Sequence, residues 1–370
     1  MKAKNETLRL GYKTEQLLRT LYPWGTGCCF RHPVRVALFH FVALCSFHVV
    51  LTRHYGVFSG NPQVRNFVED WTYVPTTLTL TVIVYYYFSL PKKLGRALQN
   101  LVENGVFPSN RVAVQCKYFL GLHRRFGQGI PFLFATLMVI GGVLLWPQQA
   151  SWTEEKVWFQ INNEALLLVM ISWWISWFAL IGLLVNIFVA WLFIKNIFRY
   201  NKIAVYALHP DGGGGLGPLG MYSVHLSYLG LLVGLTLIVY TAHSITRKKI
   251  EHDYALMGTI SVYFLIVPSL FYMHLWTVHK AMKDFRDRLL VVTATHYLNQ
   301  SLKLYRTLNA ISTDSMRQAL AELNELKSLR EHQRAYPTWP FPIISHWGII
   351  FRSALPIFFT VLELLIEILK

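Results

Sequence analysis

Long apolar runs separated by polar, basic segments dominate the pattern of the chain. A helix that crosses about 30 Å of hydrocarbon needs roughly 20 mostly apolar residues. Six runs approach or exceed this length: Val34–Leu51, Trp71–Leu90, Ile130–Trp146, Ala165–Ile194, Leu219–Ala242 and Ala255–Trp276. A seventh run, Trp347–Leu369, is long enough but carries charged residues. The pattern predicts an all-α fold, a polytopic membrane helix bundle of six or seven transmembrane helices.

The second of these runs contains a stretch whose pattern differs from the rest. The alternating segment Thr77-Leu-Thr-Leu-Thr81 is typical of a strand. In lipid an isolated strand would leave its backbone N–H and C=O groups without hydrogen-bond partners, whereas a helix pairs them within the segment. We therefore expect a helix throughout this run.

The small share of charged residues supports a membrane protein. Charged residues make up 15% of the chain and hydrophobic residues 54%, whereas soluble domains are about 25% charged. The chain also holds 12 Trp and 19 Tyr residues, which are favoured where a membrane meets water. Much of the surface is therefore expected to face the lipid bilayer.

Basic residues alternate between the two sides of the expected membrane. The loops of one side hold 26 Lys and Arg residues and comprise 1–33, 91–129, 195–218 and 277–346. The loops of the other side hold 6 and comprise 52–70, 147–164 and 243–254. Because loops rich in Lys and Arg remain in the cytoplasm, we expect a multi-pass protein of the plasma membrane with a cytoplasmic N-terminus.

This topology divides the chain into four parts. Residues 1–33 form a cytoplasmic N-terminal segment, and residues 34–276 form a bundle of six spans that includes the cytoplasmic helical loop 91–129. In that loop a helix at Lys92–Glu103 is expected to end at Asn104-Gly105, because glycine is favoured just after a helix. Residues 277–346 form a cytoplasmic helical hairpin, and residues 347–370 form a C-terminal apolar helix, either spanning or interfacial.

The expected hairpin has two apolar faces. Its first half continues the sixth run and places apolar residues at alternating spacings of four and three, typical of a heptad seam: Val278, Met282, Phe285, Leu289 and Val292. Its second half runs from about Ser315 to Glu331, with Leu320, Leu323, Leu326 and Leu329 three residues apart. These faces either pack on each other and on the 91–129 helices, or form a coiled coil in an oligomer.

A glycine-rich loop joins the fourth and fifth runs on the side expected to be cytoplasmic. It reads Leu208-His-Pro-Asp-Gly-Gly-Gly-Gly-Leu-Gly-Pro-Leu-Gly220 and leads into the amino-terminal end of the fifth run. The free N–H groups and helix dipole of such an end favour an anion. The candidate ligand- or anion-binding residues are His209, Asp211, Gly212, Gly213, Gly214, Gly215 and Gly217. The alternative is a structural turn that lets two spans pack closely.

Two short stretches of the chain carry a resemblance. The pattern His209-Pro-Asp-x-x-Gly-Gly-Leu-Gly-x-Leu-Gly220 and the segment Tyr336-Pro-Thr-Trp-Pro-Phe341 resemble features of uncharacterised bacterial multi-spanning inner-membrane proteins. The resemblance covers less than a tenth of the chain and brings no activity with it. It implies a bacterial inner-membrane setting.

The last apolar helix carries a polar stripe. Five residues of this helix lie three or four positions apart and therefore share one side of it: Arg352, Pro356, Thr360, Glu363 and Glu367. Charged residues within a span usually face the bundle interior or water. Arg352, Thr360, Glu363 and Glu367 are therefore candidate pore-lining residues if the helix spans the membrane. If it lies at the interface instead, the carboxylates reach the headgroups.

The sequence contains no trusted catalytic motif. No HExxH, GxSxG or P-loop pattern is present, and we expect no metal and no other cofactor. Histidines within the apolar runs, such as His40, His48 and His225, are interpreted as polar residues satisfied inside the bundle. The pair Gly230 and Gly234 forms a GxxxG motif, which favours the close approach of another helix.

The leading functional hypothesis is a cytoplasmically gated channel, pore or membrane-perturbing effector. Its basis is the cytoplasmic helical mass, the glycine-rich loop and the charged last helix. The alternatives are a small-solute transporter, a membrane enzyme that uses His209 and Asp211, and a scaffold for a soluble partner. The expected partners are the lipid bilayer, further copies of the chain in a homo-oligomer and a soluble cytoplasmic protein bound through 277–346, with no nucleic acid.

Overall fold

The computed structural model describes residues 32–61, 63–70, 72–106, 129–152, 158–200, 209, 211, 213–246, 254–307, 313–334, 336 and 338–340. These residues form seven α-helices and two short 3-10 helices, and no strand occurs among them. The order is α3 (Pro33–His54), η1 (Phe67–Glu69), α4 (Tyr73–Glu103), α6 (Gly129–Trp152), η2 (Trp158–Gln160), α7 (Asn163–Tyr200), α8 (Gly217–Thr246), α9 (Tyr254–Thr307) and α10 (Thr313–Arg334). The prediction of an all-α fold is confirmed for this part of the chain.

Three of the described helices are long and apolar enough to cross a membrane. They are α3, α7 over Asn163–Arg199 and α8 over Gly217–Ala242. The apolar part of α6, Gly129–Leu144, is shorter. Phe39 on α3 is 74% exposed and Leu144 on α6 is 64% exposed, as expected for side chains that face lipid. The chain is therefore a membrane protein.

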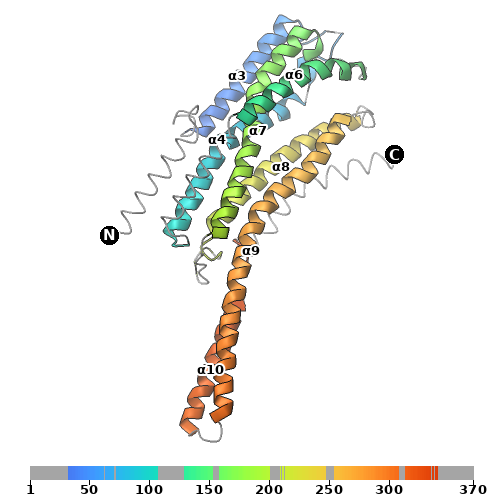
Figure 1. Ribbon diagram of the computed structural model, residues 1–370. Coiled ribbons are helices and arrows are strands. Elements are labelled where there is room, and N and C mark those ends of the chain that lie inside the picture. The colour runs from blue at the N-terminus through green and yellow to red at the C-terminus, as the bar shows by residue number, and fades with distance from the viewer. Residues whose placement is uncertain are drawn as a thin grey trace.

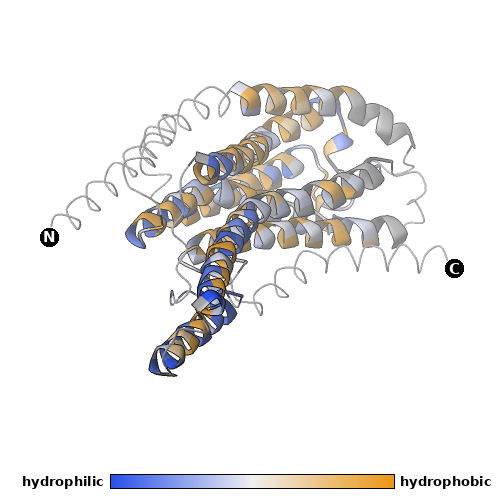
Figure 2. Ribbon diagram, turned by 60° about the horizontal axis from the view of Figure 1, so that its bottom comes forward, coloured by the Kyte–Doolittle hydropathy of each residue, from blue (hydrophilic) through white to orange (hydrophobic). Residues whose placement is uncertain are grey.

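The helices form a bundle with one long projection. In Figure 1 the helices α3, α4, α6, α7 and α8 pack beside one another with the first part of α9, and α9 then continues away from them. Helix α10 returns along α9, so that the two form a hairpin outside the bundle. Figure 2 shows the hairpin as a largely hydrophilic rod and the bundle as largely hydrophobic.

The main core lies where α4, α7, α8 and α9 meet. Five large apolar side chains are buried together there, each at most 2% exposed: Leu90, Leu183, Ile187, Leu219 and Met282. Fully burying a leucine or methionine side chain contributes about 1.5–3 kcal/mol relative to water. In a membrane the gain comes from close packing instead, because the competing environment is already apolar.

The end of α4 follows from its last residues. The Gly105 N–H donates to the Val102 carbonyl at 3.0 Å and the Val106 N–H to the Leu101 carbonyl at 3.0 Å. Gly105 has a φ of 72°, which glycine adopts without steric cost. This is a Schellman motif, and it confirms the helix end expected at Asn104-Gly105. The motif also buries Val106, which is 1% exposed, against the main core.

The apolar side chains at the end of the sixth run and in its continuation lie partly in the main core and partly at the surface. Val278 and Met282 are 2% and 1% exposed and lie in the main core, with Phe285 packed against it. Val292 is instead 61% exposed. The first part of the heptad pattern thus packs within the chain, as in the first of the two interpretations above, and the later part does not.

The GxxxG motif of α8 contacts helix α9 of the same chain. The Tyr263 hydroxyl of α9 donates to the Gly230 carbonyl of α8 at 3.0 Å. Gly230 and Gly234 are both buried. The absence of side chains at these positions lets α9 approach the α8 backbone.

Candidate functional site

The segment between α3 and α4 folds into a compact turn before the second run begins. The Asn66 and Glu69 side chains form a capping box that starts η1: the Asn66 N–H donates to Glu69 Oε2 at 3.2 Å. Asn66 Oδ1 accepts the Asn61 N–H at 2.9 Å. These local bonds fix the backbone that carries Arg65 and Asp70.

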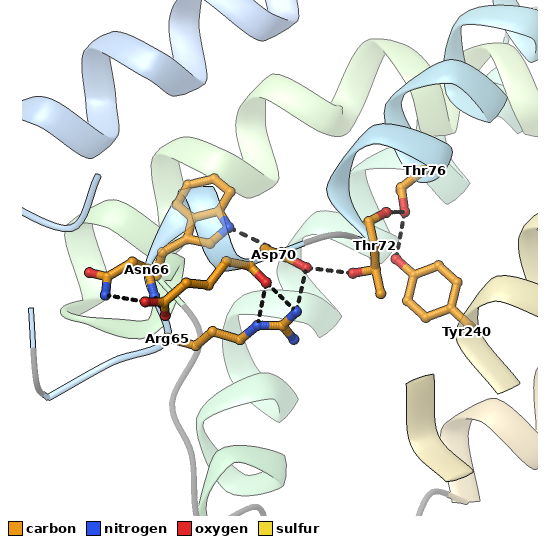
Figure 3. Close-up of polar contacts among 8 residues, drawn as sticks. Arg65, Asn66, Asp70, Thr72, Thr76 and Tyr240 are labelled. Atoms are coloured by element: carbon orange, nitrogen blue, oxygen red, sulfur yellow. Dashed lines mark hydrogen bonds and ion pairs between the residues drawn. The ribbon is translucent and has the colours of Figure 1, made fainter. Parts of the chain in front are cut away.

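Arg65 and Asp70 form the centre of a buried polar group, which we call the Asp70 cluster together with Thr72 and Trp158. The two charged side chains are 7% and 9% exposed, with Arg65 Nη2 3.7 Å from Asp70 Oδ1. The Thr72 hydroxyl donates to Asp70 Oδ1 at 2.6 Å. The Trp158 indole N–H donates to Asp70 Oδ2 at 3.2 Å. Figure 3 shows the Arg65, Asp70 and Thr72 side chains pointing toward one another.

Arg65 also hydrogen-bonds to the backbone of the turn. Its Nε and Nη2 atoms donate to the Glu69 carbonyl at 3.1 and 2.7 Å. A buried charge is costly unless it is paired and hydrogen-bonded. Here the carboxylate has two hydrogen-bond donors and the charge of Arg65 beside it, and the guanidinium has the Glu69 carbonyl as an acceptor, so both charges are compensated.

A line of hydroxyl groups leads from this cluster between α4 and α8. The Thr76 hydroxyl donates to the Thr72 carbonyl at 2.7 Å. Because its proton is used there, Thr76 Oγ1 accepts from the Tyr240 hydroxyl, 2.7 Å away on α8. One turn further along α4, Thr79 is hydrogen-bonded to Thr236 of α8. We call Thr72, Thr76, Thr79, Thr236 and Tyr240 the hydroxyl seam.

The hydroxyl seam penetrates the apolar part of the bundle. With a rise of 1.5 Å per residue, the seven steps from Thr72 to Thr79 cover about 10 Å along the chain direction of α4. Thr236 and Tyr240 belong to the apolar stretch of α8 that is long enough to span. Between two helices in lipid, hydroxyl pairs stabilise association and offer donors and acceptors to a permeating ion or proton.

A separate polar group lies between α3, α4 and α7. His48 is 0% exposed, and its Nε2 is 2.8 Å from Ser172 Oγ and its Nδ1 2.9 Å from the Tyr73 hydroxyl. The Ser172 hydroxyl donates to the Val169 carbonyl at 2.7 Å, so Nε2–H is the donor and Nδ1 accepts from Tyr73. His40 likewise contacts Ser176 at 3.1 Å. His48 is therefore satisfied within the bundle, as interpreted from the sequence, whereas the buried Nδ1 of His40 has no hydrogen-bond partner among the described residues.

The glycine-rich loop wraps around its own carboxylate. Asp211 Oδ1 accepts the N–H groups of Gly213 and Gly215 at 2.9 and 3.0 Å, and Oδ2 accepts that of Gly217 at 2.8 Å. His209 Nδ1 is 2.8 Å from Oδ1. The position expected for an anion at the start of α8 is therefore filled by Asp211, and an external anion would have to displace it.

The hydrogen bonds of the loop determine the charge state of Asp211. Partial burial on its own would raise the pKa of its carboxyl group. The three backbone N–H donors and the His209 imidazole outweigh this effect and hold that pKa below its usual range. Asp211 is therefore ionised at neutral pH and acts as an N-terminal cap of α8.

The glycines of the loop allow two close approaches. A Cβ at Gly213 would lie 2.8 Å from the Pro340 carbonyl oxygen, and a Cβ at Gly215 would lie 2.7 Å from Val106 Cγ2. The φ of Gly215 is also positive, at 89°. The loop thus joins the end of α4, the start of α8 and the segment after α10, which favours the structural role that the sequence left open.

Other predicted site residues lie outside the described residues. They are Gly212 of the loop and the four candidate pore-lining residues Arg352, Thr360, Glu363 and Glu367. Among the residues that the structure describes, no group of three or more His, Cys, Asp or Glu side chains is arranged to hold a metal ion. The assignment of these positions stays a prediction.

The Asp70 cluster and the hydroxyl seam were missed by the sequence analysis. A signal for them was present: Thr72, Thr76 and Thr79 are spaced by four and three, and Thr236 and Tyr240 by four. Polar residues at helical spacing inside apolar runs indicate a polar helix face. The strand-like alternation of the same stretch obscured this face.

The comparisons with known proteins supply no family for the chain. No protein-family model, no curated protein and no solved structure matches it. The functional argument therefore depends on the site geometry.

Proposed function

We propose that the chain is a channel that conducts protons or small cations across a membrane and is gated through the α9–α10 hairpin. The observation that carries this proposal is the hydroxyl seam. It runs from the Asp70 cluster between α4 and α8 and into the apolar part of the bundle. Hydroxyl oxygens between two helices can replace part of the hydration shell of a permeating cation.

The gating part of the proposal rests on the continuity of α9. This helix has 54 residues, packs on α7 and α8 and extends without a break into the hairpin. His279, near the exit from the bundle, contacts the Thr338 carbonyl through Nδ1 at 2.8 Å and stacks on Trp339 at 4.1 Å. A force on the hairpin would therefore reach the helices that pack against α8.

The proposal is tested by ion flux into liposomes that contain the purified protein. Thr76→Val and Thr79→Val remove hydroxyls of the seam and keep the side-chain shape. We expect each to reduce flux about 10- to 100-fold, because a hydrogen bond to a charged species is worth roughly 1.5–3 kcal/mol and about 1.4 kcal/mol is tenfold in rate.

Thr81→Val is the matched control for both variants. Its hydroxyl donates to the Thr77 carbonyl of the same helix at 2.8 Å, outside the hydroxyl seam, so its flux should match that of the unchanged protein. Equal flux in all three variants, with equal thermal stability in detergent, would contradict the proposed conduction path.

The topology belongs to the same proposal: six or seven spans in a bacterial inner membrane, with the hairpin in the cytoplasm. It is supported by the unequal distribution of Lys and Arg between the loops. In a background without native cysteines, Gln149→Cys should react with an impermeant thiol reagent in intact cells, and Ser328→Cys should react only after lysis. The opposite labelling pattern would reverse the orientation.

The last apolar helix supplies a prediction about selectivity. If Glu363 and Glu367 line the channel, the double replacement Glu363→Gln with Glu367→Gln removes negative charge and keeps the shape. Cation selectivity, measured as the reversal potential in a salt gradient, should fall toward zero. Unchanged selectivity would place this helix at the membrane interface and leave the hydroxyl seam as the only proposed path.

A further inference from the structure

The two helices of the hairpin differ in how charged residues are distributed along them. Helix α10 carries four acidic and four basic residues over Thr313–Arg334. By contrast, residues 291–302 of α9 contain no Lys, Arg, Asp or Glu. A hairpin surrounded by water does not need a stretch of twelve residues without charge on its surface.

This uncharged part of α9 exposes a heptad stripe. Its residues follow one another at spacings of four, three, four and three. We call them the α9 stripe: Val291, Thr295, Leu298, Leu302 and Tyr305. Val291 is 65% exposed, Leu298 56%, Leu302 45% and Tyr305 75%. Apolar residues at these spacings are the seam along which two helices supercoil.

Helix α10 does not cover the α9 stripe. The Thr293 hydroxyl donates to Gln333 Oε1 of α10 at 2.8 Å, and Thr293 is 5% exposed. At 3.6 residues per turn, position 293 lies about 200° around the helix from position 291. The stripe therefore faces away from the hairpin partner.

Lipid does not reach the α9 stripe either. The apolar run of α9 ends at Trp276, and at 1.5 Å per residue Val291 lies about 22 Å further along the helix and Tyr305 about 44 Å. The hairpin also points away from the bundle (Figure 1). The stripe needs an occupant outside the membrane.

We propose that the α9 stripe pairs with the same stripe of a second copy of this chain, in a parallel two-stranded coiled coil. Two copies in one membrane project their hairpins on the same side, so their α9 helices run parallel. In a symmetric pair each residue faces its own counterpart, which repels if it is charged. The flanking positions Val292, Ala294, Asn299 and Ser301 are uncharged, and Arg306 flanks the stripe only at its end beside Tyr305. Repulsion between counterparts is therefore absent over 291–302.

The short length of the stripe is compatible with pairing of membrane-anchored chains. Two heptads are marginal for a free helix in water. Anchoring both chains in one bilayer raises the effective concentration of each stripe for the other, as a linker does. The inference is independent of the proposed conduction, since it requires only that the hairpins of two copies lie side by side.

Cross-linking in native membranes tests the contact. In the full-length chain with its native cysteines replaced by serine, Leu298→Cys should form a disulfide-linked dimer under mild oxidation. Leu320→Cys is the matched control, because Leu320 is a 49% exposed leucine on α10 and lies outside the stripe. A linked dimer at 298 and not at 320 supports the proposal. Equal linking at both positions, or linkage of 298 to another protein, overturns it.

A charge within the stripe provides the second test. Leu302→Glu should weaken the association of two copies in liposomes, measured by energy transfer between labelled chains, by about 100-fold, because two buried like charges would face each other. Leu320→Glu should leave association unchanged. The helical content of both variants is compared by circular dichroism. Loss of association in both, or no association of the unchanged protein, would contradict the pairing.

Discussion

Asp70→Ala should be the most destabilising single replacement in the described bundle. We expect it to lower the free energy of unfolding by about 3–5 kcal/mol, because removing one partner leaves the buried Arg65 guanidinium without its counter-charge. The Thr72 hydroxyl and the Trp158 indole N–H would lose their acceptor as well. The measurement is thermal or denaturant unfolding in a mild detergent, followed by the tryptophan fluorescence to which Trp158 contributes.

Asp70→Asn separates the charge from the shape. The amide can keep one oxygen toward Thr72 and Arg65, but its NH₂ group then faces the Trp158 N–H, and two donors meet. We expect a loss of about 1–3 kcal/mol. Asp314→Asn on the exposed start of α10 is the control and should change stability by less than about 0.5 kcal/mol. A loss that small for Asp70→Ala would mean that the cluster contributes little to the fold.

Asp211→Ala should give the second largest loss, about 3 kcal/mol, because three backbone N–H groups lose their acceptor at the start of α8. Asp211→Asn keeps one oxygen acceptor and should lose roughly half as much. The measurement is again unfolding in detergent. A near-neutral effect of Asp211→Ala would show that water replaces the carboxylate, and the loop would then be open to an external anion.

The same carboxylate should make stability depend on pH. The pKa of Asp211 is lowered in the folded chain, so its contribution is present above the ordinary pKa of aspartate and is lost as the pH falls through the lowered value. The stability difference between the unchanged protein and Asp211→Asn should therefore be constant above about pH 5 and shrink below about pH 4. A difference that persists to pH 2 would contradict an ionised, hydrogen-bonded Asp211.

The sequence predicts the helices well because lipid removes the alternatives. The run Val34–Leu51 corresponds to α3 at Pro33–His54, and the strand-like Thr77–Thr81 stretch lies within α4. A backbone in lipid must pair its own N–H and C=O groups, so an apolar run of that length forms a helix whatever its local pattern. The number of spans is less determined by length alone: three described helices qualify, while α9 mixes an apolar first part with a polar extension.

Contacts between distant segments are what the sequence leaves undetermined. Thr76 and Tyr240 are 164 positions apart, and nothing in either neighbourhood specifies the other. The heptad pattern from Val278 to Val292 likewise predicts an apolar face but not its partner. Val278 packs in the main core, whereas Val292 is exposed, because the bundle ends between them. Periodicity reports which side of a helix is apolar, and the tertiary fold decides what covers it.

The contact between Gly213 and Pro340 has a consequence for the order in which the protein is made. Pro340 follows Gly213 by 127 positions, which a ribosome takes about 6–25 s to add. During that interval α8 is complete, yet the loop before it has no neighbour at Gly213. The loop can therefore reach its final packing only after α9 and α10 have been synthesised, and a nascent chain that stops short of residue 340 should expose it to a protease from the side of the hairpin.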